Sequence, residues 1–304
     1  MNISIKKKEK ECLKAQQGFP LEVEIPNNIM IEVTNGCNLA CRWCYHKCMK
    51  RKIGVMEFSL YKRIIDECVE LGVENVGLYT TGESFLHPKI YEFIKYAKQR
   101  GIKYVYITTN GNALKEESIP KILESGLDSI KFSIDACLKE TYEKYKVHAR
   151  WEKLRKVVKL LRQERDKQKS SLKIFGSYVI SKHNKDELKL YDEIWKPYID
   201  ETLFTEVNSI GGQLDEYKQD DPGSYSPCSL LWNRFIITYD GKLTICCVDF
   251  EASMIYADLN ETTLRSAWNN DKIKDFRRQH KEMDFKTLPL CANCDGIYRG
   301  KDED

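Results

Sequence analysis

The sequence lacks a long apolar run, a secretory signal and a large charge of one sign, and each absence excludes a class of protein. No stretch approaches the ~18 consecutive apolar residues of a membrane-spanning helix. The first residues, Met1 to Lys14, are rich in Lys and Glu and lack the apolar segment of a signal peptide. A formal net charge of +3 gives no reason to expect nucleic acid as a partner. We therefore expect a globular cytoplasmic protein that binds neither membranes nor nucleic acid.

Cysteine is the residue in excess, with 12 in 304 residues. The chain has no secretory signal and is too long to need disulfide staples. In a reducing compartment, cysteines are more often metal ligands, catalytic groups or small buried residues. Their spacing decides among these roles.

Strand-like apolar runs alternate with helical periodicity between residues 29 and 208. This alternation predicts parallel strands joined by right-handed crossovers. A closed barrel of eight strand–helix units usually needs ~250 residues. Because only about 180 residues carry the pattern, it favours an α/β fold with a partial (β/α)6 TIM-like barrel. In such a fold the functional site lies at the carboxyl ends of the strands. The expected strands are 29–33, 76–79, 104–108, 129–134, 172–180 and 201–207, and the expected helices are 60–71 with Ser59 as N-cap, 88–100, 116–125, 139–169 and 185–195.

The alternation stops near Asn208, and a different pattern follows. Gly211-Gly212 and Asp220–Ser224 are typical of a loop or linker. Asp240-Gly241 between two β-prone runs predicts a β-hairpin with a type I′ turn, and helical stretches follow at 263–269 and 271–280. We expect an N-terminal extension (1–28), a barrel (29–208) and a small C-terminal hairpin and helix domain (209–304).

Two groups of cysteines have metal-ligand spacing. Cys37, Cys41 and Cys44 form a C-x3-C-x2-C motif in the loop after the first expected strand. Thiolates suit soft metals, and three of them leave one iron of a four-iron cluster without a protein ligand. Zinc sites usually have four ligands, and Cys48 is a possible fourth, so spacing alone leaves zinc open. The second group surrounds the expected hairpin and ends in a C-x2-C pair, and it suits zinc and iron–sulfur equally: Cys228, Cys246, Cys247, Cys291 and Cys294.

The first motif, with Trp43 just before its last cysteine, resembles the signature of the radical S-adenosylmethionine (SAM) superfamily. In that family three thiolates bind a [4Fe–4S] cluster, whose open iron chelates SAM. Reductive cleavage of SAM then gives a 5′-deoxyadenosyl radical that abstracts hydrogen from a substrate. The resemblance covers roughly residues 29–208 and implies that Trp43 also lies at the cofactor.

Four further elements at strand ends resemble SAM-binding elements of the same family. They are Thr81-Gly82-Glu83, Thr109-Asn110-Gly111, Ser133-Ile134-Asp135 and Tyr145-Lys146. The resemblance implies cofactor contacts from Gly82, Glu83, Asn110, Ser133, Asp135 and Lys146. The chain departs from the family where Thr81 replaces a glycine and where Lys146 replaces an arginine, which removes a bidentate fork.

The second cysteine group resembles the SPASM/twitch appendage of radical SAM enzymes. The resemblance implies that one auxiliary [4Fe–4S] cluster is held by Cys228, Cys246, Cys291 and Cys294, with Cys247 as second choice for the third ligand. Ala267-Trp268-Asn269 and Phe276-Arg277 also resemble the helical spacer of that appendage. Cys247 then remains as a packed core thiol or as a hydrogen-atom donor to a substrate radical.

These resemblances imply a radical SAM enzyme that dehydrogenates a small-molecule substrate, such as a sugar or cyclitol, with flavodoxin or ferredoxin as reductant. About 28 residues precede the first expected strand, too few for the leader-binding domain of ~80 residues that peptide-modifying members often carry. An epimerase or peptide-modifying maturase on the same fold remains an alternative, as does a zinc or electron-transfer protein. Position suggests contact with SAM or substrate for His46 and substrate contacts for Glu206 and Asp249. The other histidines are expected as surface or cap residues: His87, His148, His183 and His280.

Overall fold

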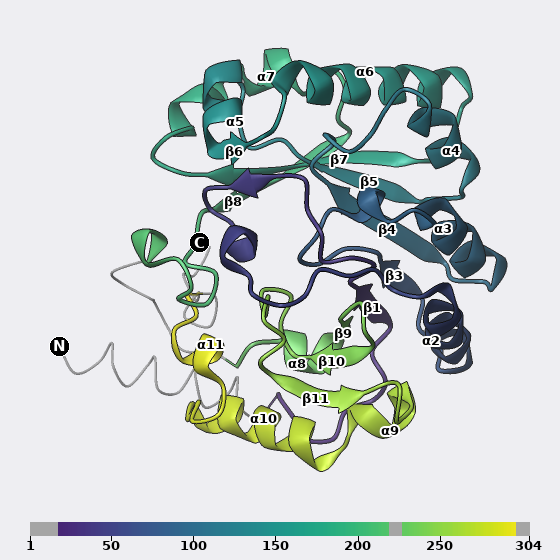
Figure 1. Cartoon of the computed structure of the whole chain (residues 1–304), viewed down its shortest axis with the longest axis vertical. Coiled ribbons are helices and arrows are strands. Elements are labelled where there is room, and N and C mark those ends of the chain that lie inside the picture. Colours follow the sequence, from purple (N-terminus) through teal and green to yellow (C-terminus); the bar gives the residue numbers. More distant parts are fainter. Residues whose placement is uncertain (1–17, 219–226, 296–304) are drawn as a thin grey trace.

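The computed structural model describes residues 18–218 and 227–295, in which nine strands form one sheet. The strand order is β11-β10-β9-β1-β3-β4-β5-β7-β8 (Figure 1). Every neighbouring pair from β9 through β1 to β8 is parallel, as the βα alternation predicts. The expected α/β class with an incomplete parallel barrel is confirmed. The barrel strands are β1 Asn28–Ile31, β3 Asn75–Gly77, β4 Tyr104–Thr109, β5 Ser129–Ser133, β7 Lys173–Ile180 and β8 Glu201–Glu206.

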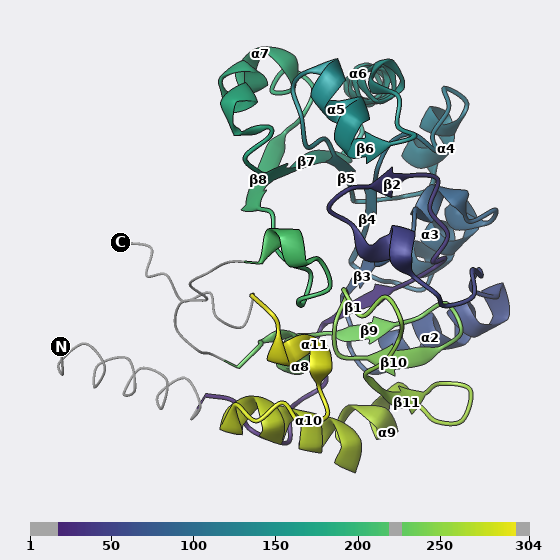
Figure 2. The same ribbon diagram turned by 60° about the vertical axis from the view of Figure 1, so that its left-hand side comes forward.

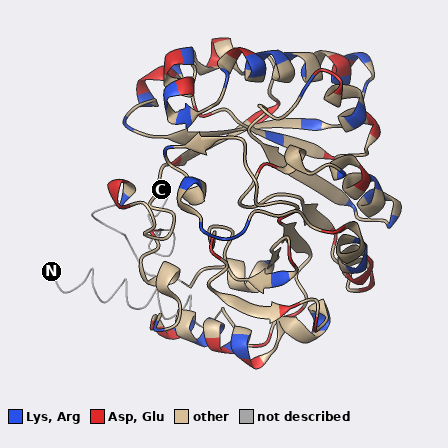
Figure 3. Ribbon diagram, in the orientation of Figure 1, with Lys and Arg blue, Asp and Glu red and all other residues tan. Residues whose placement is uncertain are grey.

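The crossover helices cover the outer face of these strands (Figures 1 and 2). Helix α2 shows why: Tyr61, Ile64, Ile65 and Cys68 recur at helical spacing and are all buried. The opposite faces of the helices carry charges of both signs, as Figure 3 shows. The helices are α2 Phe58–Glu70, α3 Ile90–Gln99, α4 Ser118–Glu124, α5 Lys139–Tyr145, α6 Trp151–Lys167 and α7 Tyr191–Ile194, with 3-10 turns at η1 Tyr45–Cys48, η2 Ser84–Leu86, η3 Lys185–Leu190 and η4 Asp215–Tyr217.

Three expected helices differ from the prediction. Ser59 does not cap α2, because the helix begins at Phe58 and Glu57 is its N-cap residue. The segment 139–169 is two helices separated by the short strand β6 Lys146–Val147, which pairs with β2 Ala40–Cys41. His148 follows in a left-handed conformation (φ 72°), which ends any continuous helix. The expected helix at 185–195 is a 3-10 turn followed by the short α7.

The C-terminal part continues the barrel sheet, because β9 Phe235–Ile237 pairs in parallel with β1. The hairpin turn is not type I′. Of the two turn residues, only Gly241 has a positive φ. The Thr238 carbonyl accepts from the Gly241 amide, and the Thr238 amide donates to the Lys242 carbonyl. This pattern is a turn closed by a glycine bulge. The remaining elements are α8 Leu230–Asn233, β10 Lys242–Thr244, β11 Ile255–Asp258, α9 Leu264–Trp268, α10 Asp271–Glu282 and α11 Pro289–Ala292.

The N-terminal segment packs on the C-terminal helices. The indole of Trp268 donates to the Glu24 carbonyl at 2.8 Å, and that of Trp232 donates to the Pro20 carbonyl at 2.7 Å. The expected linker Asp220–Ser224 lies outside the described residues. None of the helices in 18–218 and 227–295 is long and apolar enough to cross a membrane.

Candidate functional site

The loop after β1 brings three thiols to the carboxyl ends of the neighbouring strands. Cys37, Cys41 and Cys44 line one pocket of about 170 Å³. The side chain of Asn35 fixes the loop, because it donates to the Lys52 carbonyl at 2.9 Å and accepts from the Gly54 amide at 2.8 Å. The predicted thiol triad therefore converges on a single pocket.

Burial keeps these thiols neutral in the absence of a metal. It raises the pKa of Cys37 to about 11 and that of Cys44 to about 12, and it also raises the pKa of Cys41. Such thiols are poor nucleophiles, but a bound metal would stabilise their thiolates. Among the described residues, no three His, Cys, Asp or Glu side chains come close enough together to hold a single metal ion. The triad thus fits a body larger than one ion, such as a four-iron cluster, and Cys48 is exposed and outside the pocket.

Gly82 and Glu83 join the end of β3 to the thiol loop. A Cβ at Gly82 would lie 2.3 Å from the Thr34 carbonyl oxygen, so only glycine fits this approach. The Glu83 amide donates to the Gly36 carbonyl at 2.8 Å. Thr81, which departs from the family pattern, lines the pocket while its hydroxyl bonds the buried carboxylate of Glu32.

The carboxylate of Glu83 organises the next strand end. It accepts from the Thr109 hydroxyl and from the Asn110 amide, both at 2.7 Å. Burial raises the pKa of Glu83, and these hydrogen bonds oppose that effect. The Asn110 amide group lies 3.9 Å from the Cys37 sulfur, and Ser133 also lines the pocket.

Asp135 and Lys146 form a buried ion pair beside the thiols. Lys146 Nζ lies 2.6 Å from Asp135 Oδ2, and both side chains are almost fully buried. Burial is the largest single influence and lowers the pKa of Lys146, but the charges of Asp135, Cys41 and Tyr142 and the hydrogen bond to Asp135 together outweigh it and raise that pKa. Lys146 lines the pocket and its strand pairs with Cys41, so the pair connects the α5–α6 region to the thiol loop.

Two residues predicted near the cofactor lie elsewhere in the structure. Trp43 is not among the residues that line the pocket; it stacks on Tyr145, with ring centroids 5.4 Å apart. His46 bonds the Asn35 carbonyl oxygen at 2.6 Å, which gives it a structural role in the loop. Both hold the thiol loop in place from its outer side.

The C-terminal thiols form a second group. Cys228, Cys246, Cys291 and Cys294 line one enclosed cavity, and Cys247 is not among the lining residues. Burial raises the pKa of Cys228 to about 11 and also raises that of Cys291. Four thiols around one cavity fit a fully ligated cluster. They come from the start of α8, the end of the β9–β10 hairpin and α11.

Cys247 follows Cys246 directly and lies near the charged side chains of Arg234 and Lys131. A hydrogen bond with Cys246 lowers the pKa of Cys247 to about 7. The charges of Arg234 and Lys131 also lower this pKa, whereas burial raises it. Lys131 and Arg234 were not predicted as site residues. The sequence held a signal for Lys131, because side chains alternate along the strand Ser129–Ser133 and Lys131 therefore lies on the same face as the predicted site residue Ser133.

The structure corrects two other expectations. Asp249 is not free to contact a substrate, because it accepts hydrogen bonds from Thr244 and from the backbone of Ser253 and Met254. His280 is buried rather than on the surface, whereas His87, although also buried, is the C-cap residue of η2. Burial lowers the pKa of His280 to about 4, and this ring lines the second thiol cavity. Glu206 is an exposed residue at the end of β8.

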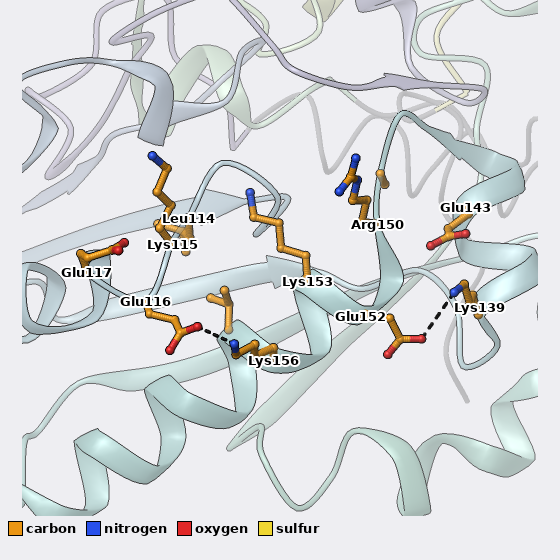
Figure 4. A pocket seen from close by; sticks show the side chains of 12 residues that line it. Leu114, Lys115, Glu116, Glu117, Lys139, Glu143, Arg150, Glu152, Lys153 and Lys156 are labelled. Carbon is orange, nitrogen blue, oxygen red and sulfur yellow. Dashed lines mark ion pairs between the residues drawn. The ribbon is translucent and has the colours of Figure 1, made fainter.

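A cavity larger than the thiol pocket lies away from the thiols. It is a groove of about 770 Å³ on the outer face, between the loop before α4 and helices α5 and α6 (Figure 4). Some of its charged side chains form ion pairs, as do Lys139 with Glu152 at 3.6 Å and Lys156 with Glu116. It contains none of the cysteines, so its size does not indicate chemistry.

Comparison with protein families agrees with this geometry. The family model of the radical SAM superfamily matches residues 31–194, which hold the first thiol triad. The model of an iron–sulfur cluster-binding domain, SPASM, matches residues 228–295, which hold the second thiol group.

Several characterised proteins are similar to this chain. The S-adenosyl-L-methionine-dependent 2-deoxy-scyllo-inosamine dehydrogenase of Niallia circulans is 24% identical over 274 residues, covering 88% of this chain and 92% of that protein. The GTP 3′,8-cyclase of Chlorobaculum tepidum is 30% identical over 131 residues, covering 43% of this chain and 39% of that enzyme.

Solved structures share the fold. BtrN in complex with AdoMet and 2-DOIA superposes with a TM-score of 0.64 at 20% identity, covering 90% of this chain and 94% of BtrN. Streptococcus suis SuiB bound to its precursor peptide SuiA gives a TM-score of 0.69 at 16% identity, covering 96% of this chain and 74% of SuiB. The chain belongs to the radical SAM superfamily and is an enzyme that uses SAM and [4Fe–4S] clusters, one of them an auxiliary cluster.

Proposed function

We propose that this enzyme dehydrogenates a small polyhydroxylated metabolite, a sugar or cyclitol, in the interior of the barrel. The observation that carries the proposal is the contact between Cys246 and Cys247. Cys246 lines the four-thiol cavity, whereas the neighbouring Cys247 lies close to Lys131 and Arg234 of the barrel interior. An auxiliary cluster held by that cavity would lie next to the substrate, where it is suited to accept an electron from a substrate radical.

We assign the two thiol groups to the two clusters. Cys37, Cys41 and Cys44 would hold the cluster that binds SAM, and the cavity of Cys228, Cys246, Cys291 and Cys294 would hold the auxiliary cluster. Bound there, SAM supplies the 5′-deoxyadenosyl radical that abstracts hydrogen. This protein's own part is positioning: it fixes the thiol loop against β3 and presents polar side chains at the strand ends.

The residues around the first pocket would orient SAM. Glu83 is fixed by Thr109 and Asn110, and the buried Asp135–Lys146 pair holds a preorganised charge at the pocket wall. Ser133 and Asn110 add polar groups to the same wall. Groups held in this way need little reorganisation when the cofactor binds.

The similarity to the Niallia circulans dehydrogenase supports the reaction class, because it extends along nearly the whole of both chains. That enzyme acts on a cyclitol amine according to its name, and we extend only the class, a polyhydroxylated ring, to this protein. We also propose a small acidic reductant, flavodoxin or ferredoxin, and a cytoplasmic location, because cysteines that hold iron–sulfur clusters must stay reduced.

The test is turnover of the anaerobically reconstituted enzyme with reductant and a panel of cyclitols, sugars and their phosphorylated or acidic derivatives. We expect one class to stimulate 5′-deoxyadenosine formation and to give a product two mass units lighter than the substrate. Substrate deuterated at the reacting carbon should transfer deuterium to 5′-deoxyadenosine. Stimulated cleavage with a product of unchanged mass would contradict dehydrogenation.

Epimerisation is the second candidate, because the Cys247 thiol lies near Lys131 of the barrel interior and would from there be able to return a hydrogen atom to the substrate. The two reactions differ in their isotope pattern. An epimerase run in deuterium oxide gives a product carrying one solvent deuterium, and its Cys247→Ala variant cleaves SAM without forming product. A dehydrogenase incorporates no deuterium at the oxidised carbon, and the same variant still forms product.

A further inference from the structure

In the described part of the chain, the barrel interior holds two cations, Lys131 and Arg234, that have no acidic partner among residues 18–218 and 227–295. Lys131 is directly opposite Thr108 on β4 and Phe175 on β7. Thr108 lines the first thiol pocket, and paired residues of neighbouring strands share a face of the sheet. Lys131 therefore faces the interior, one row below Ser133, and its Nζ lies 5.7 Å from the centroid of the Tyr79 ring.

Arg234 reaches the same region from the C-terminal part. It precedes β9, whose pairing with β1 brings its Nη1 to 3.2 Å from the sulfur of Met30. Met30 is no substitute for an acid, because a thioether is only a weak acceptor. The Nε of Arg234 is buried and has no hydrogen-bond partner.

No carboxylate in the described part of the chain balances the charges of Lys131 and Arg234. Neither side chain forms an ion pair with a described carboxylate. Burial lowers the pKa of Lys131, and the nearby charge of Arg234 lowers it further, whereas the Cys247 thiolate raises it. Two like charges in a partly desolvated space repel each other unless an anion joins them.

Two other buried cations have acidic partners: Lys146 is paired with Asp135 at 2.6 Å, and Arg51 with Glu32 at 2.6 Å. The fully buried Arg277 has no acidic partner among the described residues, but it donates hydrogen bonds to three carbonyl oxygens, those of Leu21, Leu231 and the Asn269 side chain. Lys131 and Arg234 are each only partly buried, so a ligand entering the barrel is able to reach them. The missing partner is therefore best supplied by that ligand.

We propose that Lys131 and Arg234 bind an oxyanion of the substrate, a phosphate or a carboxylate. This inference rests on the proposed function for the assignment of the barrel interior as the substrate site. It narrows the substrate to a phosphorylated or acidic polyol. The carboxylate of SAM is the competing oxyanion, and the experiment separates the two.

The probe is inorganic phosphate, titrated by calorimetry into the reconstituted enzyme saturated with SAM, with no reductant present. The variants are Lys131→Met and Arg234→Met. Lys121→Met on α4 is the matched control, because this lysine is also placed over a tyrosine ring, Tyr91 at 5.9 Å, but is exposed. We expect each interior variant to weaken phosphate binding about 10- to 100-fold, and the control to leave it unchanged.

Two further measurements keep the test independent of the folding of the variants. Lys131→Arg retains the charge and should bind phosphate within about threefold of the unmodified enzyme. In the unmodified enzyme, phosphate should protect Lys131, but not Lys121, from acetylation by acetic anhydride, measured by mass spectrometry. SAM affinity should be the same in all variants.

The outcomes are distinct. The inference is overturned if phosphate does not bind, if Lys131→Met and Lys121→Met bind it equally, or if Lys131→Met weakens SAM binding instead. It is also overturned if neutral polyols are oxidised by the unmodified enzyme with a kcat/KM no lower than that of their phosphorylated or acidic derivatives, a result that leaves the proposed dehydrogenation intact. Phosphate binding that depends on both cations, without oxidation of any anionic polyol, supports the anion site and contradicts the proposed function.

Discussion

Replacing Gly82 by Ala should displace the loop that carries the three thiols. The added Cβ would lie 2.3 Å from the Thr34 carbonyl oxygen, 2.6 Å from the Gly36 carbonyl oxygen and 2.9 Å from the Asn35 carbonyl carbon. All three atoms belong to the backbone, so no side chain is able to rotate away. Because ordinary contacts begin at 3.4 Å, the loop must move by about 1 Å.

That displacement has two expected consequences. Overpacking of this kind costs about 1–3 kcal/mol in the free energy of unfolding. A misplacement of about 1 Å at a reacting centre is able to cost about 100-fold in rate. We therefore expect Gly82→Ala to lose the first cluster, with iron falling from about eight to about four atoms per chain, or to keep it and cleave SAM about 100-fold more slowly.

The assay combines iron analysis, calorimetric titration with SAM and formation of 5′-deoxyadenosine. Gly101→Ala is the matched control, because Gly101 has a φ of +96° and its Cβ would meet no atom within 4 Å. The control should lose about 1–3 kcal/mol of stability through backbone strain and keep its iron and its SAM cleavage. Iron content and cleavage rate equal to those of the unmodified enzyme in Gly82→Ala would refute the reasoning, and so would equal loss in both variants.

Three other substitutions test separate features. Cys246→Ala should lose the auxiliary cluster, about four irons per chain, whereas Cys247→Ala should keep both clusters; equal iron in the two variants would contradict the assignment. Burial lowers the pKa of His87 below its ordinary value of 6.5, so protonation favours the unfolded chain. The free energy of unfolding should then fall below pH 6.5, by up to about 1.4 kcal/mol per pH unit, and His87→Gln should flatten that slope in denaturant titrations; an unchanged slope would exclude this role. Arg51→Met leaves the nearly fully buried Glu32 without its cation and should lower the free energy of unfolding by about 3–5 kcal/mol, measured in urea. The double variant Glu32→Gln/Arg51→Met should recover most of that loss. A double variant no more stable than Arg51→Met would contradict this role of the ion pair.

The parallel sheet could be predicted from the sequence because each buried strand is a short apolar run between helical segments. The thiol triad and the strand-end elements were also accessible, since they follow these runs directly. The pairing of β2 with β6 could not be predicted from the sequence. Lys146 lies in a stretch with helical periodicity, and two-residue strands leave no pattern of their own. The partner of Lys146 is a buried aspartate 11 positions earlier, and only the folded chain brings the two together.

The two adjacent cysteines show a second limit. The sequence names both Cys246 and Cys247 as possible ligands, and spacing to the other thiols does not distinguish residues that differ by one position. In the structure only Cys246 lines the four-thiol cavity, while the charges near Cys247 are those of Lys131 and Arg234. Only the folded chain shows which of the two adjacent side chains faces the cavity.

The cations of the barrel interior illustrate how function can depend on a contact that no local pattern contains. Lys131 alone resembles any lysine in a strand, and Arg234 alone resembles any residue before a hairpin. They become one site because β9 adds to the barrel sheet beside β1, which places the two cations in the same interior although 102 residues separate them. The auxiliary-cluster part of the chain therefore contributes more than a metal site. By supplying Arg234, it contributes half of the charge that would select an anionic substrate.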